Sequence, residues 1–193
     1  MTFEEIKNKL KNCTVGIAGA GGLGSNCAVA LARVGIGTLI ISDFDIVTES
    51  NLNRQYFFKD QLGQKKVLAL KRNIERINPE VNIITHDIRL SENNIVDIYK
   101  NCDVVVEAFD LAEMKKMLIE TFLSALPEMP LVLGLGMAGW GKNNDIKFRK
   151  SENLYICGDE ESEIAEENPP LAPRVGMVAN MQANTVLEIL LNK

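Results

Sequence analysis

The stretch GAGGLGSN, Gly19–Asn26, lies between two apolar runs and decides the fold. It fits the pattern G-x-G-x-x-G, in which glycines permit a tight turn and let backbone N–H groups approach a phosphate closely. The run before it, Thr14–Gly19, is apolar and β-branched, and the apolar residues after it recur at helical spacing. The sequence therefore predicts a strand, a turn and a helix, although a turn that binds no ligand would show the same pattern.

The segments that follow predict a doubly wound α/β fold. A second apolar run, Thr38–Asp45, follows two glycines and ends in acidic residues. It completes a β-α-β unit. Unbroken apolar strands indicate a Rossmann-like, mainly parallel sheet with helices on both faces. Further strands are expected at 81–88, 103–110 and 131–139, an edge strand at 145–150, and helices within 63–79, 91–102 and 111–126.

Length and patterning indicate how the chain is divided. Its 193 residues, 46% of them hydrophobic, suit a single domain. Thr2 and Glu5 have the spacing of a capping box, which favours a short N-terminal helix. A long acidic, proline-bearing and aperiodic stretch precedes the last amphipathic segment. We expect one domain, 1–193, with an N-terminal helix within 1–12, a crossover loop at 151–172 and a C-terminal helix at 173–193.

Composition narrows the partners and the location. The formal net charge of −5 and the pI near 5.1 give no electrostatic reason to bind nucleic acid or an anionic membrane. No apolar run reaches the roughly 18 residues of a membrane span, and the N-terminus lacks the apolar core of a signal peptide. A cytoplasmic location is expected. The four cysteines are far apart and there is one histidine, so neither a disulfide framework nor a zinc site is expected.

The glycine turn is the first candidate for ligand binding. In a doubly wound sheet the ligand lies beyond the carboxyl ends of the strands, where Gly19, Gly21, Gly22 and Gly24 are expected. Asp43 follows about 20 residues later, at the end of the second strand, where an acid can accept hydrogen bonds from ribose hydroxyls. A loop cap is the alternative role for Asp43. An NAD-dependent Rossmann oxidoreductase fits these residues equally well.

The next segment favours a triphosphate as the ligand. A dinucleotide pyrophosphate carries about two charges and is largely bound by backbone amides, whereas a triphosphate carries nearly four and requires guanidinium and ammonium groups. Arg54, flanked by Asn51 and Gln55, and then Lys66 follow the second strand. Asp110 ends a later strand, where a carboxylate can hold Mg²⁺ against phosphates. Read singly, Arg54 and Lys66 are compatible with solvated surface charges; their joint placement predicts an ATP site.

Five segments in this order resemble the ThiF/MoeB/HesA family of ubiquitin-activating-enzyme-like adenylyltransferases: GAGGLGS at 19–25, DFDIVTESNLNRQ at 43–55, GQKKV at 63–67, EAFD at 107–110 and APRVGMVANMQAN at 172–184. The resemblance covers nearly the whole chain. It implies ATP- and Mg²⁺-dependent adenylation of the C-terminal glycine carboxylate of a small ubiquitin-fold sulfur-carrier protein ending in Gly-Gly, and a homodimer. The short chain most resembles the compact ThiF branch, which adenylates the carrier ThiS for thiamine thiazole biosynthesis.

The resemblance also implies a role for each candidate residue. The glycine turn would contact phosphate, and Asp43 would contact the ribose. Arg54, Lys66 and Asp110 would carry the catalysis. Binding of the triphosphate is implied for Asn51, Arg54 and Lys66, with Gln55 beside them, and binding of magnesium for Asp110.

Departures from the family keep other functions open. Many relatives carry two C-x-x-C pairs for zinc and supply an arginine from an N-terminal helix to the partner subunit, whereas this chain has no such pair and residues 1–12 contain no arginine. A non-catalytic carrier-binding module is therefore one alternative, and a molybdopterin-type carrier or a tRNA base as acceptor is another. Cys157 is a candidate for acyl or sulfur transfer, although its acidic neighbours disfavour a thiolate.

Overall fold

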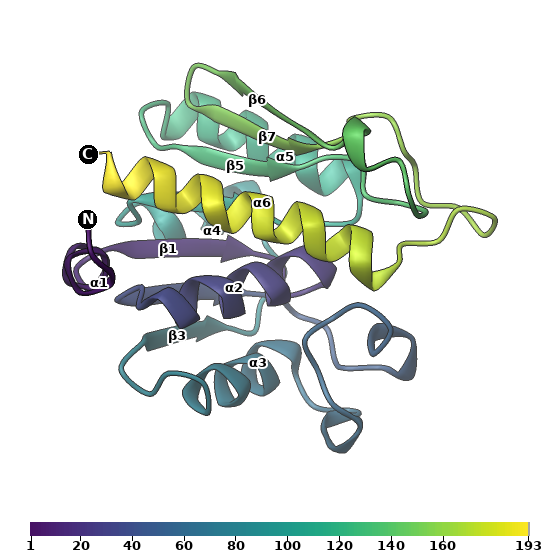
Figure 1. Ribbon diagram of the computed structural model, residues 1–193, viewed down its shortest axis with the longest axis horizontal. Coiled ribbons are helices and arrows are strands. Elements are labelled where there is room, and N and C mark those ends of the chain that lie inside the picture. The colour runs from purple at the N-terminus through teal and green to yellow at the C-terminus, as the bar shows by residue number, and fades with distance from the viewer. Residues whose placement is uncertain (193) are drawn as a thin grey trace.

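The computed structural model describes residues 1–192 and is built around one seven-stranded sheet with the strand order β3-β2-β1-β4-β5-β7-β6 (Figure 1). All neighbouring strands are parallel except β6 and β7, which are antiparallel. The predicted mainly parallel α/β sheet is therefore confirmed. The strands are β1 (Thr14–Ala18), β2 (Thr38–Ser42), β3 (Asn82–His86), β4 (Val104–Glu107), β5 (Leu131–Gly134), β6 (Lys147–Ser151) and β7 (Leu154–Gly158).

Helices cover both faces of the sheet, as expected for a doubly wound fold. In Figure 1, α2, α3 and α6 lie on one face and α4 and α5 on the other. No helix within residues 1–192 is long and apolar enough to cross a membrane. The α-helices are α1 (Phe3–Leu10), α2 (Gly22–Val34), α3 (Lys66–Glu75), α4 (Glu92–Tyr99), α5 (Ala112–Ala125) and α6 (Ala172–Leu191), and short 3₁₀ turns are η1 (Glu49–Asn51), η2 (Lys59–Gln61) and η3 (Asn143–Asp145).

The core has two parts because the strands are buried on both faces. Alternate residues of β1 point to opposite sides, so Val15 and Ile17 pack with α2 and α6, whereas Ala18 packs with α4 and α5. Tyr99 of α4 is fully buried, and its hydroxyl donates a hydrogen bond to the Ile17 carbonyl at 3.1 Å. The continuous apolar runs of the sequence therefore correspond to strands covered by helices on both faces.

The main correction concerns residues 151–172, which were expected to form a crossover loop. Its first part forms β7, which pairs with β5 and with the predicted edge strand β6. This strand is only five residues long, and its apolar run at 154–157 stands just before a row of acids, so the run was assigned to the loop. The remaining residues 159–171 do form an irregular connection, and α6 then begins at Ala172 and ends at Leu191. Lys193, the expected last residue of that helix, lies outside the described residues.

The N-terminal helix has the predicted start. In α1, the Thr2 side chain accepts a hydrogen bond from the Glu5 backbone, and the Glu5 carboxylate accepts one from the Thr2 backbone at 2.6 Å. Both contacts satisfy N–H groups that the first helical turn leaves without partners. The capping box therefore forms as the sequence predicts.

The turn after β1 depends on two glycines. Gly19 has a φ of +102°, which favours glycine, and its carbonyl faces the first turn of α2. A Cβ atom added to Gly24 would lie 1.9 Å from the Gly19 carbonyl oxygen, a distance that no real contact allows. The absence of side chains at these positions therefore lets α2 begin directly against the end of β1.

This packing predicts that Gly24→Ala destabilises the protein. Since the added Cβ meets backbone that cannot move independently, we expect a loss of about 1–3 kcal/mol in the free energy of unfolding, measured by urea denaturation. Gly176→Ala in α6 is the matched control because nothing lies within 4 Å of its added Cβ. Its stability should be unchanged or higher by about 1 kcal/mol at most. Equal stability of the two variants would contradict the prediction.

Candidate functional site

The candidate site lies at the carboxyl ends of β1 and β4, the right-hand edge of the sheet in Figure 1. The chain leaves β1 toward β2 and leaves β4 toward β5, on opposite sides, which makes this pair the topological switch point. The Ala108 backbone N–H donates to the Ala18 carbonyl at 2.9 Å and holds the two strand ends together. Ligands of doubly wound sheets bind at this position.

The N-terminus of α2 opens onto the switch point without a side-chain cap. Its N-cap residue is Gly21, and its first turn contains no acidic residue. The first N–H groups of a helix have no partner within the helix, and together with the helix dipole they favour an anion. The sequence places Gly21 and Gly22 here as predicted.

Asp43 fixes the glycine turn. Its Oδ2 accepts a hydrogen bond from the Ala20 backbone at 2.7 Å, and its Oδ1 accepts one from the Asp45 backbone at 2.8 Å. Burial raises the pKa of Asp43 above its ordinary value, although the nearby Lys66 charge and the two backbone hydrogen bonds act in the opposite direction. The predicted alternative role as a loop cap is therefore present, and the carboxylate keeps lone pairs for a further donor such as a hydroxyl.

Arg54 lies against the start of α2. A Cβ atom added to Gly22 would lie 3.6 Å from Arg54 Cγ. The Arg54 Nη1 donates to the Ser50 carbonyl at 3.1 Å and to Asn53 Oδ1 at 2.8 Å. The Asn26 side chain holds the Arg54 backbone by donating to its carbonyl at 2.9 Å. Sequence reasoning did not assign Asn26 this role, although it is the last residue of the quoted glycine stretch.

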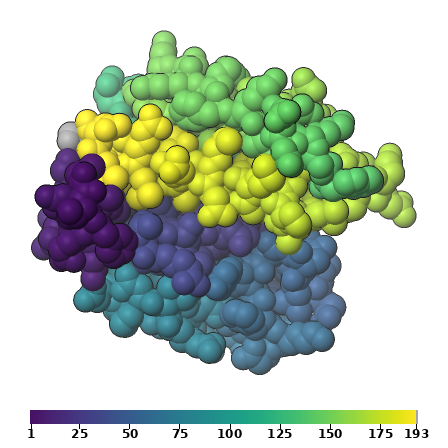
Figure 2. Space-filling view, viewed as in Figure 1, coloured from purple at the N-terminus to yellow at the C-terminus, as the bar shows by residue number. Residues whose placement is uncertain are grey.

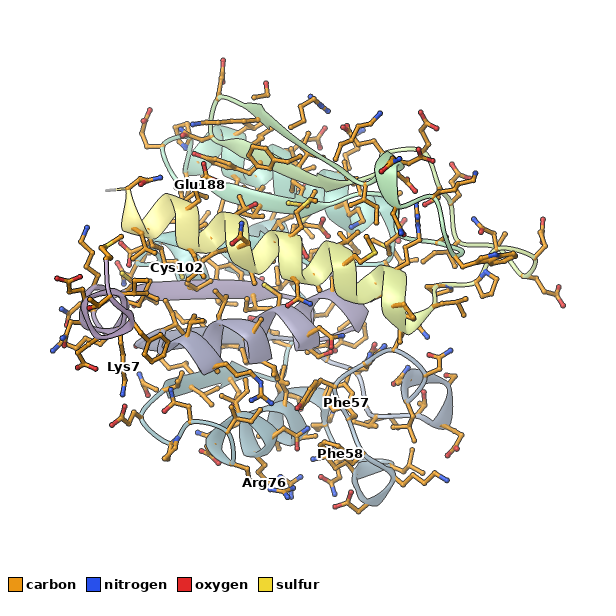
Figure 3. The ribbon with its side chains drawn as sticks, in the orientation of Figure 1. Lys7, Phe57, Phe58, Arg76, Cys102 and Glu188 are labelled. Carbon is orange, nitrogen blue, oxygen red and sulfur yellow. The ribbon has the colours of Figure 1, made fainter. Side chains whose placement is uncertain are left out.

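An aromatic residue anchors the segment that carries Arg54. Phe57 is buried in the core, whereas its neighbour Phe58 is 46% exposed. Figure 3 labels both in the connection between β2 and α3, at the opposite end of the molecule from Lys7. The Tyr56 backbone N–H also donates to Ser25 Oγ at 3.0 Å, which ties this connection to α2. The cationic segment is therefore held at the site by packing and by hydrogen bonds.

Lys66 is a buried cation at a second helix N-terminus. It is the first residue of α3, its side chain is 7% exposed, and its Nζ lies 2.8 Å from Asp45 Oδ2. The first turn of α3 contains no acid, and its N-cap residue is also a lysine. A cation next to the positive end of a helix dipole is unfavourable unless an anion lies nearby. Arg54 and Lys66 therefore mark a place suited to an anion, and Asp45 partly compensates Lys66.

The remaining predicted residues lie around the same edge. Asn51 Oδ1 accepts a hydrogen bond from the Thr48 backbone at 3.0 Å and so stabilises η1. Gln55 is buried beside Gly21, and its Oε1 has no hydrogen-bond partner within residues 1–192. Asp110 is exposed just beyond β4. The site therefore has polar groups that remain available to a ligand.

A buried ion pair beneath Asp110 was not predicted from the sequence. Lys115 Nζ lies 2.9 Å from both carboxylate oxygens of Glu107 and 2.9 Å from the Gly134 carbonyl. Glu107 also accepts a hydrogen bond from the Phe109 backbone at 2.6 Å. Burial raises the pKa of Glu107 more than Lys115 lowers it. An acid at the end of an otherwise apolar strand was the signal that could have identified this pair.

A groove of about 720 Å³ opens between the loops that follow β5 and β7. These loops project at the right of Figure 2, beside the N-terminal end of α6. Trp140 is 73% exposed at the groove. Arg174 and Asp159 also contribute to its lining, and they form an ion pair of 2.5 Å with side chains only 4% and 6% exposed. The lining combines an aromatic side chain with acidic and basic groups.

The pKa of Asp159 is about 2, below its ordinary value of 3.8. Burial by itself raises this pKa. Hydrogen bonds from the Ser162 and Glu161 backbones and from Arg174 favour the charged form and outweigh the burial. The carboxylate is therefore ionised throughout the neutral range and compensates the buried guanidinium.

Cys157 does not belong to the site. It lies in β7 rather than in the expected loop, it is fully buried, and its Sγ lies 3.6 Å from Thr185 Oγ1. Burial raises the pKa of this thiol to about 11, so the expected direction was right but the cause is burial and not the acidic neighbours. A buried, protonated thiol is poorly suited to transfer chemistry, and the structure gives no support to that role.

Comparison with known proteins agrees with this geometry. A model of the ThiF family matches residues 2–193. The chain belongs to the ThiF family. The resemblance that the motifs implied is thereby confirmed at the level of the family, without distinguishing the ThiS-specific branch.

This ThiF-family chain spans less than half the length of one curated relative it matches and about three quarters of another. It is 33% identical over 190 residues to "Adenylyltransferase and sulfurtransferase MOCS3" of Caenorhabditis briggsae, with 95% of this chain and 47% of the relative covered. It is 29% identical over 191 residues to "Molybdopterin-synthase adenylyltransferase" of Salmonella typhimurium, with 96% and 76% covered. The solved structure of the E. coli tRNA N6-threonylcarbamoyladenosine dehydratase TcdA in complex with ATP has the same fold, with a TM-score of 0.88, 21% identity and 98% and 90% covered.

The low pKa of Asp159 predicts a pH-dependent stabilisation. Since the folded pKa is about 2 and the unfolded pKa about 3.8, the contribution is complete at neutral pH and is lost as the pH falls toward 2. At about 1.4 kcal/mol per pKa unit it amounts to about 2 kcal/mol, of which about half is gone by pH 3.

Urea denaturation of Asp159→Asn between pH 7 and pH 3 measures this contribution. The wild type should lose more stability over that range than the variant, because the variant lacks the titrating carboxylate. Asp145→Asn, at an exposed position of the same groove, is the matched control and should follow the wild type. Parallel stability curves for the wild type and Asp159→Asn would contradict the prediction.

Proposed function

We propose that this protein uses ATP and Mg²⁺ to adenylate the C-terminal glycine carboxylate of a small ubiquitin-fold sulfur-carrier protein that ends in Gly-Gly, with release of pyrophosphate. One observation carries the proposal: Arg54 and Lys66 place two cations at the N-termini of α2 and α3, and Asp45, beside Lys66, is the one carboxylate paired with either of them within residues 1–192. Membership of the ThiF family supports the same chemistry.

The residues of the site suit ATP. The uncapped start of α2 offers N–H groups to phosphate oxygens, and Asp43 retains lone pairs for ribose hydroxyls. Gln55 has a buried oxygen that lacks a partner within residues 1–192, and Asn51 lies at the edge of the same segment. These groups lie around the strand edge at which Arg54 and Lys66 supply positive charge.

The reaction needs positioning and charge neutralisation more than proton transfer. A C-terminal carboxylate has a pKa of about 3.5 and is already a nucleophile at neutral pH. Its oxygen would attack the α-phosphorus of ATP, forming an acyl-phosphate bond as the bond to pyrophosphate breaks. Arg54 and Lys66 would reduce the repulsion between the two anions and stabilise the negative charge that moves onto the departing pyrophosphate.

Asp110 is the residue that we propose for magnesium. No group of three or more histidine, cysteine, aspartate or glutamate residues is placed to hold a metal ion within residues 1–192. Magnesium commonly binds through one or two carboxylates together with substrate phosphates and water, so a single exposed carboxylate next to the phosphate site fits it. Bound magnesium would supply further neutralisation of the phosphate charge.

For the acceptor we infer a ThiS-like carrier that serves thiamine thiazole biosynthesis. The motifs that resemble the ThiF branch support this choice. A molybdopterin-type carrier is the second candidate, because a relative 29% identical to this chain is a molybdopterin-synthase adenylyltransferase. The net charge of −5 argues against a tRNA base. The family resemblance further supports a homodimer.

Carrier-dependent exchange of labelled pyrophosphate into ATP tests the proposal. The purified protein is mixed with each small Gly-Gly-ending protein of the same cell, and exchange is expected with one of them. Exchange with the thiazole carrier alone would identify the ThiS-like acceptor. Binding of ATP without exchange on any carrier would favour a non-catalytic binding module, and binding of NADH without ATP would favour a redox enzyme.

Two substitutions test the proposed catalytic residues. Arg54→Ala and Asp110→Ala should each reduce the exchange rate on the order of 100-fold or more, because each removes a preorganised group that stabilises phosphate charge. Arg76→Ala, at the far end of α3 and labelled in Figure 3, and Asp97→Ala, exposed on α4, are the matched controls and should retain full activity. Activity within a few-fold of the wild type in either test variant would remove that residue from the mechanism.

A further inference from the structure

The loops that follow β5 and β7 are joined along their length. The Ala138 backbone N–H donates to Ser162 Oγ at 3.1 Å, and the Gly139 backbone N–H donates to the Pro169 carbonyl at 2.9 Å. The Glu160 backbone N–H donates to the Leu135 carbonyl at 3.0 Å. The groove that contains Trp140 therefore depends on contact between two loops that are distant in sequence.

Arg174, in the first turn of α6, joins both loops to the helix. Its Nη1 donates to the Gly141 carbonyl at 2.6 Å and to the Lys142 carbonyl at 3.3 Å in one loop. Its Nη2 donates to Asp159 Oδ2 at 2.5 Å in the other. The planar guanidinium can make these contacts at once because its donors point in fixed, different directions.

Ionisation of Asp159 stabilises the folded protein relative to the protonated acid, but a buried pair of charges is not more stable than an apolar pair in its place. Two charged side chains are removed from water here, and the desolvation cost of a buried ion pair often cancels its attraction. The Arg174 Nε also has no hydrogen-bond partner within residues 1–192. An apolar pair would fill the same space at lower cost, but it would not fix the two loop backbones relative to each other.

The first turn of α6 also borders the nucleotide site. Val175, the residue after Arg174, lies 3.0 Å from a Cβ atom added to Gly22 in the first turn of α2. Val175 is buried in the apolar core, which holds it independently of the ion pair. The first turn of α6 therefore contacts the glycine turn through Val175 and the groove through Arg174.

We propose that Arg174, through Asp159 and the Gly141 and Lys142 carbonyls, is a positioning residue that keeps the two loops joined, so that the groove can receive the acceptor protein beside bound ATP. This inference rests on the proposed function, since it assigns the groove to the acceptor. Breaking the pair should weaken binding of the carrier and leave binding of ATP unchanged, because the cationic residues of the ATP site lie on other elements.

The test uses the double variant Arg174→Met/Asp159→Asn, which removes both charges together and leaves no unpaired buried ion. Its Kd for ATP should stay within about two-fold of the wild-type value, and its KM for the carrier in pyrophosphate exchange should rise on the order of 10-fold. A glutamate-specific protease should also cleave the double variant faster within 160–167, where the wild-type loop is restrained. Arg174→Lys keeps the charge but lacks the planar guanidinium, whose donors reach both loops. Its KM for the carrier should therefore lie between those of the wild type and the double variant.

The matched control is Arg149→Met/Glu160→Gln. This pair joins β6 to the same loop one residue away, at 2.5 Å, but its side chains are 55% and 34% exposed. Surface ion pairs of this kind contribute little, so the control should match the wild type in Kd for ATP, in KM for the carrier, and in cleavage within 161–167, where Glu160→Gln leaves every glutamate in place.

Two results would overturn the inference. The first is an unchanged KM for the carrier in the folded double variant. The second is an equal loss of ATP and carrier binding, which would indicate a general structural role. Failure of the proposed function itself would appear differently, as a lack of exchange by the wild-type protein with every carrier.

Discussion

The close approach of α2 to the end of β1 is the constraint on which the rest of the structure depends. A Cβ atom at Gly24 would lie 1.9 Å from the Gly19 carbonyl oxygen, so the helix can begin there only on glycine. Asp43, at the end of the neighbouring strand, holds the turn through the Ala20 backbone. The helix N-terminus is thereby fixed at the switch point of the sheet, where its free N–H groups are available to a phosphate.

The site is distinguished by cations at helix N-termini and by charged side chains that are buried. Arg54 and Lys66 lie at helix N-termini, where the helix dipole disfavours cations, and Lys66 is almost fully buried. The buried pairs Glu107–Lys115 and Asp159–Arg174 lie on the other side of the glycine turn. Replacing a buried ion pair by apolar residues of similar volume often costs no stability, so stability by itself does not account for these pairs. They are consistent with a site shaped to bring two anionic reactants together.

Most of the sheet could be predicted because burial on both faces leaves a local signal. Apolar runs such as Val104–Val106 and the helical periodicity around Leu70 and Ile74 are visible within a few residues. The strand β7 was missed because its apolar run at 154–157 is short and is followed closely by acids, and Cys157 was consequently placed in a loop. The pair of Asp159 and Arg174 was missed for a related reason, since its partners are joined only by the crossing of two loops.

The sequence by itself determined the doubly wound fold, the glycine turn, and the residue types that gather at the strand ends, because those properties depend on local backbone geometry and on the order of the strands. Tertiary structure alone decided which charges are neutralised and which remain available. Lys66 is paired with Asp45, Asp43 holds Ala20, and Arg174 joins two loops across a groove. These pairings depend on distances between elements that are far apart in the chain, and no local pattern records them.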